Sequence, residues 1–253
     1  MRGNAIIAVM TNELKIISRE PGGLILLIIL PYFIAGGMAF IASFFTRVTG
    51  GVFIRQFIGF EVLMLSMIML MTGSRFLYEE RNGGRLEPLM ATPTSMYLVL
   101  FATSFVMVLV DMGAFTIASV PLVYAEYGLR GLGNMVIGLL LLFLGLMPLY
   151  GLGLLLAGLI LRFNDADSIM NVVTPILTIL SGATYPIYVL PQWIRLLILA
   201  LPMYPTADLI YSVVSSHGLN SLFLNLVLSV IAYLLIGVVS YGELERTFRR
   251  RGL

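Results

Sequence analysis

The stretch of residues 78–95, YEERNGGRLEPLMATPTS, carries five charged side chains in a chain that is only 11% charged. Its paired carboxylates, Glu79 and Glu80, with Arg85 close by, could in principle serve a metal-dependent protease within a membrane. A metal site of that kind needs several imidazoles and carboxylates that converge on one ion. The chain has a single histidine, His217, and no cysteine, so we reject metal-dependent catalysis and expect no bound metal.

Phosphate chemistry is the second possibility for this charged stretch. A P-loop needs a glycine-rich turn that ends in Gly-Lys-Ser/Thr, because backbone amides cradle the phosphates while the lysine neutralises them. The single lysine, Lys15, is followed by Ile16 and has no such turn before it. We therefore expect no ATP site, no bound cofactor and no catalytic residue in this chain.

The third possibility is mechanical. Leu86, Leu89 and Met90 are spaced to share one face of a short helix, which two prolines, Pro88 and Pro93, would limit to a turn or two. Gly83 and Gly84 permit a sharp entry to this helix, and the polar residues left for solvent or a partner are Glu79, Glu80, Arg81, Arg85 and Glu87. Such a segment can transmit force from a docked protein, whereas the simpler alternative is a solvated loop.

The elements that would hold this stretch are membrane helices. The chain is 59% apolar with a mean hydropathy of +1.00, and its uncharged runs reach the ~20 residues that cross a bilayer. We predict an all-α membrane protein with one transmembrane domain over residues 1–253. The six predicted spans are residues 23–45, 53–74, 97–120, 133–161, 168–182 and 221–242, with a charged loop at residues 75–95 between the second and third.

The basic residues predict the orientation. Eleven of the fifteen lie on the side of the two termini and the 75–95 loop, namely Arg2, Lys15, Arg19, Arg75, Arg81, Arg85, Arg162, Arg246, Arg249, Arg250 and Arg251. Because positive residues stay inside, the termini and the loop are predicted to be cytoplasmic. Residues 1–22 alternate apolar and polar side chains at near-helical spacing and end at Pro21, which predicts an amphipathic helix that lies in the membrane interface among its lipids.

The segment before the last span is apolar but interrupted. Within residues 182–206, Pro191 can begin a helix, Trp193 favours the lipid headgroup level, and Pro202 ends the helix. Because charged and proline residues interrupt it, this segment lacks the uninterrupted apolar run that a helix needs to cross the bilayer. We therefore predict a re-entrant segment on the outer side, with an ordinary loop as the less suitable alternative.

Several motifs of the chain resemble one family. The loop motif ERNGGRLEPLMATP at residues 80–93, the REP of residues 19–21, the RFNDAD of residues 162–167, and the outer motifs SGATYP, LPQW and LPMYPT of residues 181–206 occur in order. Together they resemble the permease subunits of type-2 ATP-binding cassette (ABC) exporters. In that family the first loop forms a coupling helix against the ATPase subunit.

This resemblance implies roles for the motif residues and names the partners. The implied coupling residues are Glu79, Glu80, Arg81, Gly84, Arg85, Leu86, Glu87 and Leu89, with Asp165 in the second cytoplasmic loop, and the implied outer-gate residues are Tyr185, Pro186, Pro191, Trp193 and Pro202. The partners would be ABC ATPase subunits that bind ATP and Mg²⁺, and a second permease copy or a homologue. A prokaryotic cytoplasmic membrane is the implied location, without a nucleic-acid partner.

Two acids lie inside predicted spans. Glu61 and Asp111 are eight and nine residues from the outer ends of the second and third spans, which places both roughly 12 to 14 Å below the outer surface. Ionisable residues in a membrane normally face protein or water, so the pair predicts a shared polar site on the substrate path or in the outer gate. The alternative is that each acid only hydrogen-bonds a neighbouring helix, Asp111 through Ser104, Thr116 or Ser119.

These observations favour an exporter permease that works by alternating access. An ion-coupled secondary transporter is the rival, and inverted repeats with broken helices would favour it. We find no convincing repeat. Drugs, lipids, lipid-linked glycans and small ions all remain open as substrates.

Overall fold

A computed structural model of the chain describes residues 2–19, 21–43, 50–91, 96–163, 166–183, 185, 187 and 190–250. Throughout these residues the regular structure is helical, with no strand, which confirms the predicted all-α class. In chain order the helices are α1 (Arg2–Arg19), α2 (Pro21–Ser43), α3 (Gly50–Asn82), α4 (Leu86–Ala91), α5 (Met96–Phe163), α6 (Ala166–Leu180), α7 (Gln192–Ala200), α8 (Met203–Val214) and α9 (Leu222–Arg250).

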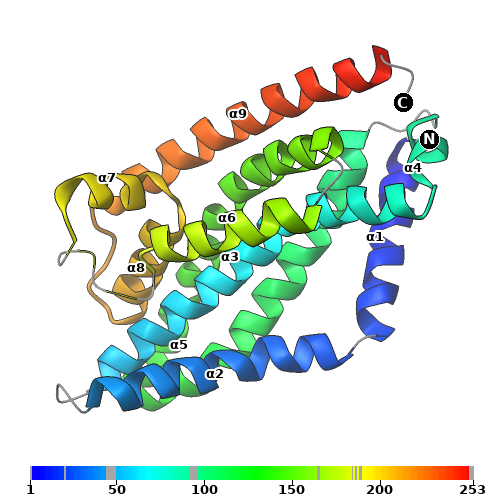
Figure 1. The fold of residues 1–253 in the computed structure, drawn as a ribbon. Helices are drawn as coiled ribbons and strands as arrows, with labels where there is room; N and C mark the ends of the chain where they lie inside the picture. Colours follow the sequence, from blue (N-terminus) through cyan, green and yellow to red (C-terminus); the bar gives the residue numbers. More distant parts are fainter. Residues whose placement is uncertain are drawn as a thin grey trace.

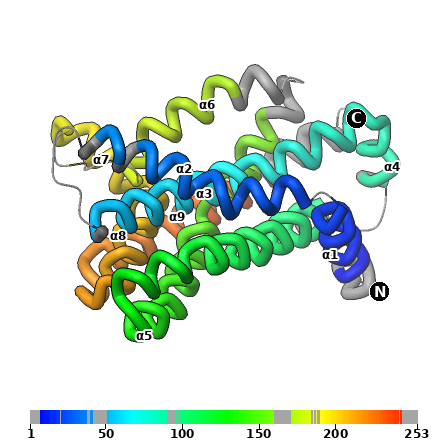
Figure 2. The backbone as a smooth tube through the Cα atoms, turned by 90° about the horizontal axis from the view of Figure 1, so that it is seen from below, coloured from blue at the N-terminus to red at the C-terminus, as the bar shows by residue number. Residues whose placement is uncertain are grey.

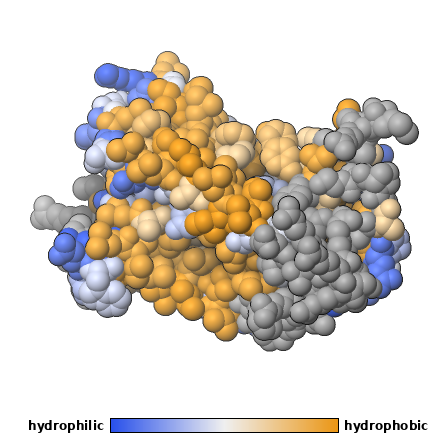
Figure 3. All heavy atoms as spheres, turned by 90° about the horizontal axis from the view of Figure 1, so that it is seen from above, coloured by the Kyte–Doolittle hydropathy of each residue, from blue (hydrophilic) through white to orange (hydrophobic). Residues whose placement is uncertain are grey.

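The helices are apolar enough to make this a multi-pass membrane protein. By length and composition, three helical segments of the described chain can cross a bilayer: Gly51–Asn82, Leu98–Leu159 and Leu222–Ser240. Two bent helix pairs, α1 with α2 and α7 with α8, raise this number to at most five. Figure 3 shows the corresponding apolar surface across the middle of the molecule, with hydrophilic residues at its two ends. The predicted count of six is not reached by this criterion.

The difference in count has three sources: α5 is one continuous helix by this criterion, α2 passes only together with α1, and α6 is too short. The 68 residues of α5 would extend about 100 Å, more than three times the thickness of a bilayer core. Gly128 breaks the helix with φ 61° and ψ −155°, a conformation that glycine adopts without a steric penalty. The chain reverses there (Figure 2), so that the Ser119 hydroxyl lies 4.0 Å from the Met135 sulfur.

The reversal within α5 corrects the predicted boundaries. The sequence predicts a loop between residues 120 and 133, but the helix runs on to Tyr127 and resumes after Gly128. Pro121 and Pro148 are both accommodated inside helical structure. A hydrophobicity pattern marks where a chain becomes more polar, whereas the helix end itself is decided by backbone conformation, here at one glycine.

Gly128 divides α5 into a first arm, residues 96–127, and a second arm, residues 129–163. Glycines let the second arm pack closely on its neighbours. A methyl group added at Gly151 would overlap the backbone carbonyl of Tyr233 in α9, and one at Gly145 would overlap the Thr206 side chain in α8. One at Gly153 would lie 3.1 Å from the Leu70 carbonyl oxygen in α3. The second arm of α5 is therefore the central element against which three other helices pack.

The molecule has two distinct ends (Figure 1). The first carries α4, the start of α1 and the end of α9, and the opposite end carries α7 and α8. The chain bends by 72° between α1 and α2 and by 80° between α7 and α8, so each of these pairs is broken rather than a straight rod. This arrangement places the charged 78–91 segment and the α7–α8 segment far apart, joined by long helices.

Candidate functional site

The charged segment begins as part of α3, which continues to Asn82, eight residues beyond the predicted end of its span. Gly84, with φ 67°, then ends the helix. The Gly84 amide donates to the Arg81 carbonyl at 3.0 Å and the Arg85 amide donates to the Glu80 carbonyl at 2.8 Å. This pair of hydrogen bonds is a Schellman cap, which requires a left-handed residue at the position of Gly84.

Arg85 is held against the end of α3. Its Nε and Nη2 atoms each lie 3.1 Å from a Glu80 carboxylate oxygen, which gives a bidentate ion pair. The hydrogen bond and charge of Glu80 raise the pKa of Arg85 above its ordinary value. Since the guanidinium is exposed, the pair contributes little stability, but it fixes the direction of both side chains at the entrance to α4.

The six residues of α4 divide into two sides. Leu86 and Leu89 are half-buried and pack on an apolar cluster made by α3 and α5, whose members are Leu77, Met96, Val99, Leu100, Leu154 and Ala157. Glu87, Pro88 and Ala91 are exposed. The two leucines that the sequence implies for coupling thus contact this chain's own helices, and the polar side of α4 is the one open to a partner.

Helix α1 reaches the same end of the molecule. Val9 packs on the cluster that holds Leu86 and Leu89. Partial burial raises the pKa of Glu13, and the charges of Glu79 and Glu80 add to that effect. The sequence reasoning missed this contact, because amphipathic spacing identifies the apolar side of α1 but not the residues that cover it.

Glu61 and Asp111 form a second polar site, inside the helical bundle. Their exposed fractions are 0% and 1%, and none of their four carboxylate oxygens has a hydrogen-bond partner among the described residues. Asp111 lies within electrostatic range of Glu61, and Glu61 within range of Tyr32 in α2. The two acids from α3 and α5 are therefore close together, as their matching depth in the sequence predicts.

The polar neighbours considered for Asp111 bond elsewhere or not at all. The Thr116 hydroxyl donates to the Met112 carbonyl at 2.7 Å, and the Ser119 hydroxyl donates to the Phe115 carbonyl. Both hydroxyls therefore bond carbonyls of their own helix and not Asp111. The Ser104 hydroxyl is buried and without a partner in the described part of the chain. Unpaired buried polar atoms cost free energy, so this pair needs an explanation beyond helix packing.

The segment that the sequence predicts on the outer side contains two short helices, α7 and α8. Pro191 directly precedes α7 and Pro202 directly precedes α8, and the Trp193 side chain is 66% exposed. Since α8 continues to Val214, the predicted boundary at residue 206 falls inside a helix and is too early. The Tyr185 hydroxyl donates to the Ile179 carbonyl, whereas Pro186 and Asp165 lie outside the described residues.

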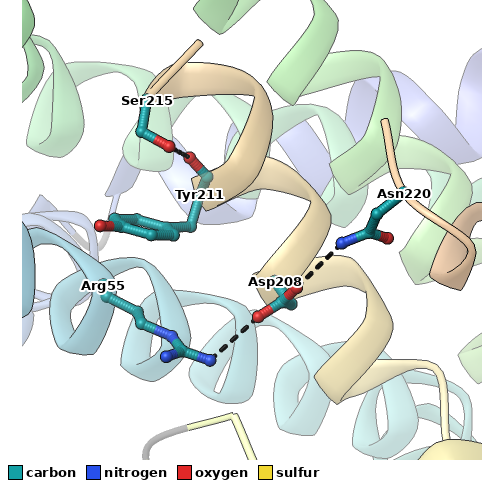
Figure 4. Close-up of polar contacts among 5 residues, drawn as sticks. All are labelled: Arg55, Asp208, Tyr211, Ser215 and Asn220. Atoms are coloured by element: carbon teal, nitrogen blue, oxygen red, sulfur yellow. Dashed lines mark hydrogen bonds and ion pairs between the residues drawn. The ribbon is translucent and has the colours of Figure 1, made fainter. Parts of the chain in front are cut away.

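A polar network at this end was not predicted (Figure 4). Arg55 Nη2 in α3 lies 2.9 Å from Asp208 Oδ1 in α8, and the Asn220 side-chain amide donates to Asp208 Oδ2 at 3.2 Å. The Arg55 guanidinium also lies 5.9 Å from the centre of the Tyr211 ring. Arg55 and Asp208 are isolated charges between apolar runs, which is the one signal in the sequence that singles them out.

Comparison with known proteins shows the family of this chain. The family model described as ABC-2 type transporter matches residues 4–214, which include the charged segment, both buried acids and α7–α8. A comparison with curated proteins found no match. The family match confirms the resemblance that the loop and outer-segment motifs indicate. The chain therefore belongs to the ABC-2 type transporter family.

Proposed function

We propose that this chain is the permease subunit of an ABC exporter, which forms the substrate pathway and couples it to a separate ATPase subunit. The observation that carries the proposal is the two-sided α4 helix. Its leucines are seated on α3 and α5, while Glu87, Pro88 and Ala91 are exposed at the same end of the molecule as both termini. A partner that pushes on α4 would therefore move two long membrane helices directly.

The exposed carboxylates around α4 suit basic residues on a partner surface, and the exposed Arg85 beside them suits an acidic one. Glu79 and Glu87 are exposed there, and Glu13 adds a further carboxylate from α1. We infer that these acids steer docking, because charge complementarity at the rim of an interface chiefly sets association rate and orientation. ATP and Mg²⁺ belong to the ATPase partner in this proposal, and this chain has no catalytic role.

The proposed membrane arrangement has six crossings. We assign them to α2, α3, the two arms of α5, α6 and α9, and treat α7–α8 as a re-entrant pair. Support comes from the Gly128 reversal and from the 80° bend between α7 and α8. The excess of basic residues near the termini favours a cytoplasmic location for both termini and for α4, in a prokaryotic cytoplasmic membrane.

The pathway itself is proposed to involve a second permease copy or a homologue, with lipids around the pair and no nucleic acid. Within each copy, we propose that Glu61 and Asp111 serve the pathway rather than helix packing. Their support is the full burial of four carboxylate oxygens that lack a hydrogen-bond partner in the described chain. The family match adds no support to an ion-coupled secondary transporter.

The test is reconstitution with an ABC ATPase subunit. We expect the wild-type chain to co-purify with the ATPase, and Glu87→Arg to weaken the complex by roughly tenfold, which is about 1.4 kcal/mol. The control is Glu126→Arg, an equal charge reversal at an exposed position. Glu126 lies close to Gly128, at the end of the first α5 arm that is distant from α4 in the chain. If the wild-type chain binds no ABC ATPase, or if both variants bind equally well, the coupling role of α4 is wrong.

A further inference from the structure

Helix α8 contacts the rest of the bundle on two sides, one towards α5 and one towards α3. Towards α5 its attachment is buried: Thr206 packs against Gly145, and Ile210 and Val214 pack against Gly138. The Asn134 side chain adds hydrogen bonds to the Val213 carbonyl at 3.0 Å and to the Ser216 hydroxyl at 3.2 Å. These contacts would be costly to break, so α8 should remain with α5.

Towards α3, α8 shares the main apolar core with Ile54, Phe57 and Ile58, and beside this buried contact lies an exposed polar network. Arg55 bonds Asp208 at 2.9 Å, with the two side chains 44% and 20% exposed, and Arg55 also faces the Tyr211 ring. Ion pairs at such exposure are typically worth less than ~1 kcal/mol. A contact of this strength is specific in geometry yet can be broken and re-formed cheaply, which a gate requires and a permanent structural contact does not.

The network also includes the start of α9. The Asn220 amide donates to Asp208 Oδ2 at 3.2 Å, while the Asn220 side-chain oxygen accepts the Leu222 amide at 3.0 Å. Asn220 therefore caps the first turn of α9 and holds Asp208 with the same side chain. Figure 4 shows Asp208 between Arg55 and Asn220, so one carboxylate in the middle of α8 joins the first turns of α3 to the residues that precede α9.

Helix α3 connects this network to the coupling end. From Arg55 to Asn82 the helix is continuous and contains no proline, over a length of about 40 Å. Asn82 directly precedes the Gly83–Gly84 turn into α4. Asp208 lies in α8, which packs on α5, so a movement of α3 relative to α5 that starts at α4 would displace Arg55 from Asp208.

We propose that Arg55, Asp208 and Asn220 form an outer latch that closes the α7–α8 end of the pathway and opens when α3 moves. This inference rests on the proposed function, since the movement of α3 is attributed to a docked ATPase. It assigns a positioning role to three residues and predicts that the α3–α8 contact breaks while the α5–α8 contact holds.

Cross-linking tests the latch directly, because the chain has no cysteine of its own. In the complex with the ATPase subunit, a short bifunctional thiol reagent should join Arg55→Cys to Asp208→Cys efficiently without nucleotide. With the non-hydrolysable ATP analogue AMP-PNP and Mg²⁺, we expect the yield to fall by roughly fivefold or more. The control pair, Asn134→Cys with Ser216→Cys, reports the α5–α8 contact and should keep its yield.

Two outcomes overturn the latch. Equal yields with and without AMP-PNP in the Arg55–Asp208 pair mean that the contact does not open, and an equal fall in both pairs means that α8 moves as a whole. Failure of the proposed function is a different result, since in that case no ATPase complex forms with the wild-type chain.

A charge exchange gives a second measurement that keeps the ion pair. Asp208→Asn should raise substrate-independent ATP hydrolysis by about two- to fivefold, the range expected for loss of one exposed ion pair. The exchange Arg55→Asp with Asp208→Arg should restore the wild-type rate. Hydrolysis that is unchanged in the single variant contradicts the latch, as does an exchanged variant that remains as fast as the single one.

Discussion

At the scale of single residues, Glu61 and Asp111 differ from the rest of the core because their buried carboxyl groups have no hydrogen-bond partner among the described residues. Both side chains are essentially unexposed. Most buried polar groups in proteins are paired, and unpaired ones are concentrated where a ligand or a conformational change supplies the partner. The pair therefore favours a role in transport over a role in packing.

Neutral isosteres test this role. Glu61→Gln and Asp111→Asn keep the size of each side chain but remove its charge, so we expect each to reduce ATP-driven transport by roughly tenfold, or about 1.4 kcal/mol. Membrane insertion and ATPase binding should remain normal in both variants. Thr103→Val is the matched control, because the Thr103 hydroxyl is buried in the same α5 arm and bonds only its own helix at the Val99 carbonyl.

Transport at the wild-type rate in both acid variants would contradict this assignment. In that case the two carboxyl groups would be structural polar contacts. A loss in Thr103→Val as large as in the acid variants would also contradict it, because any polar deletion in the α5 arm would then have the same effect.

At the scale of elements, the second arm of α5 depends on glycines at its crossings. At Gly151 the α5 backbone meets the Tyr233 carbonyl, and at Gly237 the α9 backbone meets Gly151 in return. Close approach of this kind lets backbones pack through many van der Waals contacts, which is the main source of helix association where lipid surrounds the helices. The two glycines therefore fix α9 on the bundle.

A single methyl group should loosen this crossing. We expect Gly151→Ala to destabilise the folded chain by about 1–3 kcal/mol, because the added group meets backbone that cannot rotate away. The measurement is thermal unfolding in detergent. Gly133→Ala is the control in the same helix, since a methyl group there meets nothing within 4 Å and alanine favours a helix over glycine. Equal melting temperatures for the two variants would show that the α5–α9 crossing can move apart without cost.

At the scale of the whole molecule, the two ends differ in chemistry. Figure 1 places α4, the start of α1 and the end of α9 together, opposite α7 and α8, and the middle of the molecule is apolar in Figure 3. One end carries the exposed carboxylates around α4, and the other carries the Arg55–Asp208–Asn220 network. This polarity suits a transporter whose energy input and exit gate lie on opposite sides of a membrane.

Cysteine labelling tests which end is which. Asn82→Cys should react with a membrane-impermeant maleimide only from the cytoplasmic side, because positive residues favour that side. Leu219→Cys, at a position that is 55% exposed near the other end, should react only from outside. Intact cells and inverted vesicles give the two accessibilities. Labelling of Asn82→Cys in intact cells would reverse the orientation and remove the basis for ATPase docking at α4.

The sequence by itself determined the class of the protein and its family, because apolar run length and the loop motifs are local properties. It also identified the short helix that became α4, since glycine at position 84 permits a sharp turn and proline at position 88 restricts the backbone wherever these residues stand. The pairing of Glu61 with Asp111 was accessible as well, because depth along a helix follows from counting residues.

Only the tertiary structure decided which surfaces meet. Periodicity places Leu86 and Leu89 on one face of α4, but it cannot say that this face is covered by α3 and α5 rather than by a partner. Arg55 and Asp208 are 153 residues apart, and no local pattern relates two charges at that separation. Likewise, the position of the α5 reversal depends on Gly128, whose backbone conformation is chosen by the packing of both arms rather than by hydrophobicity.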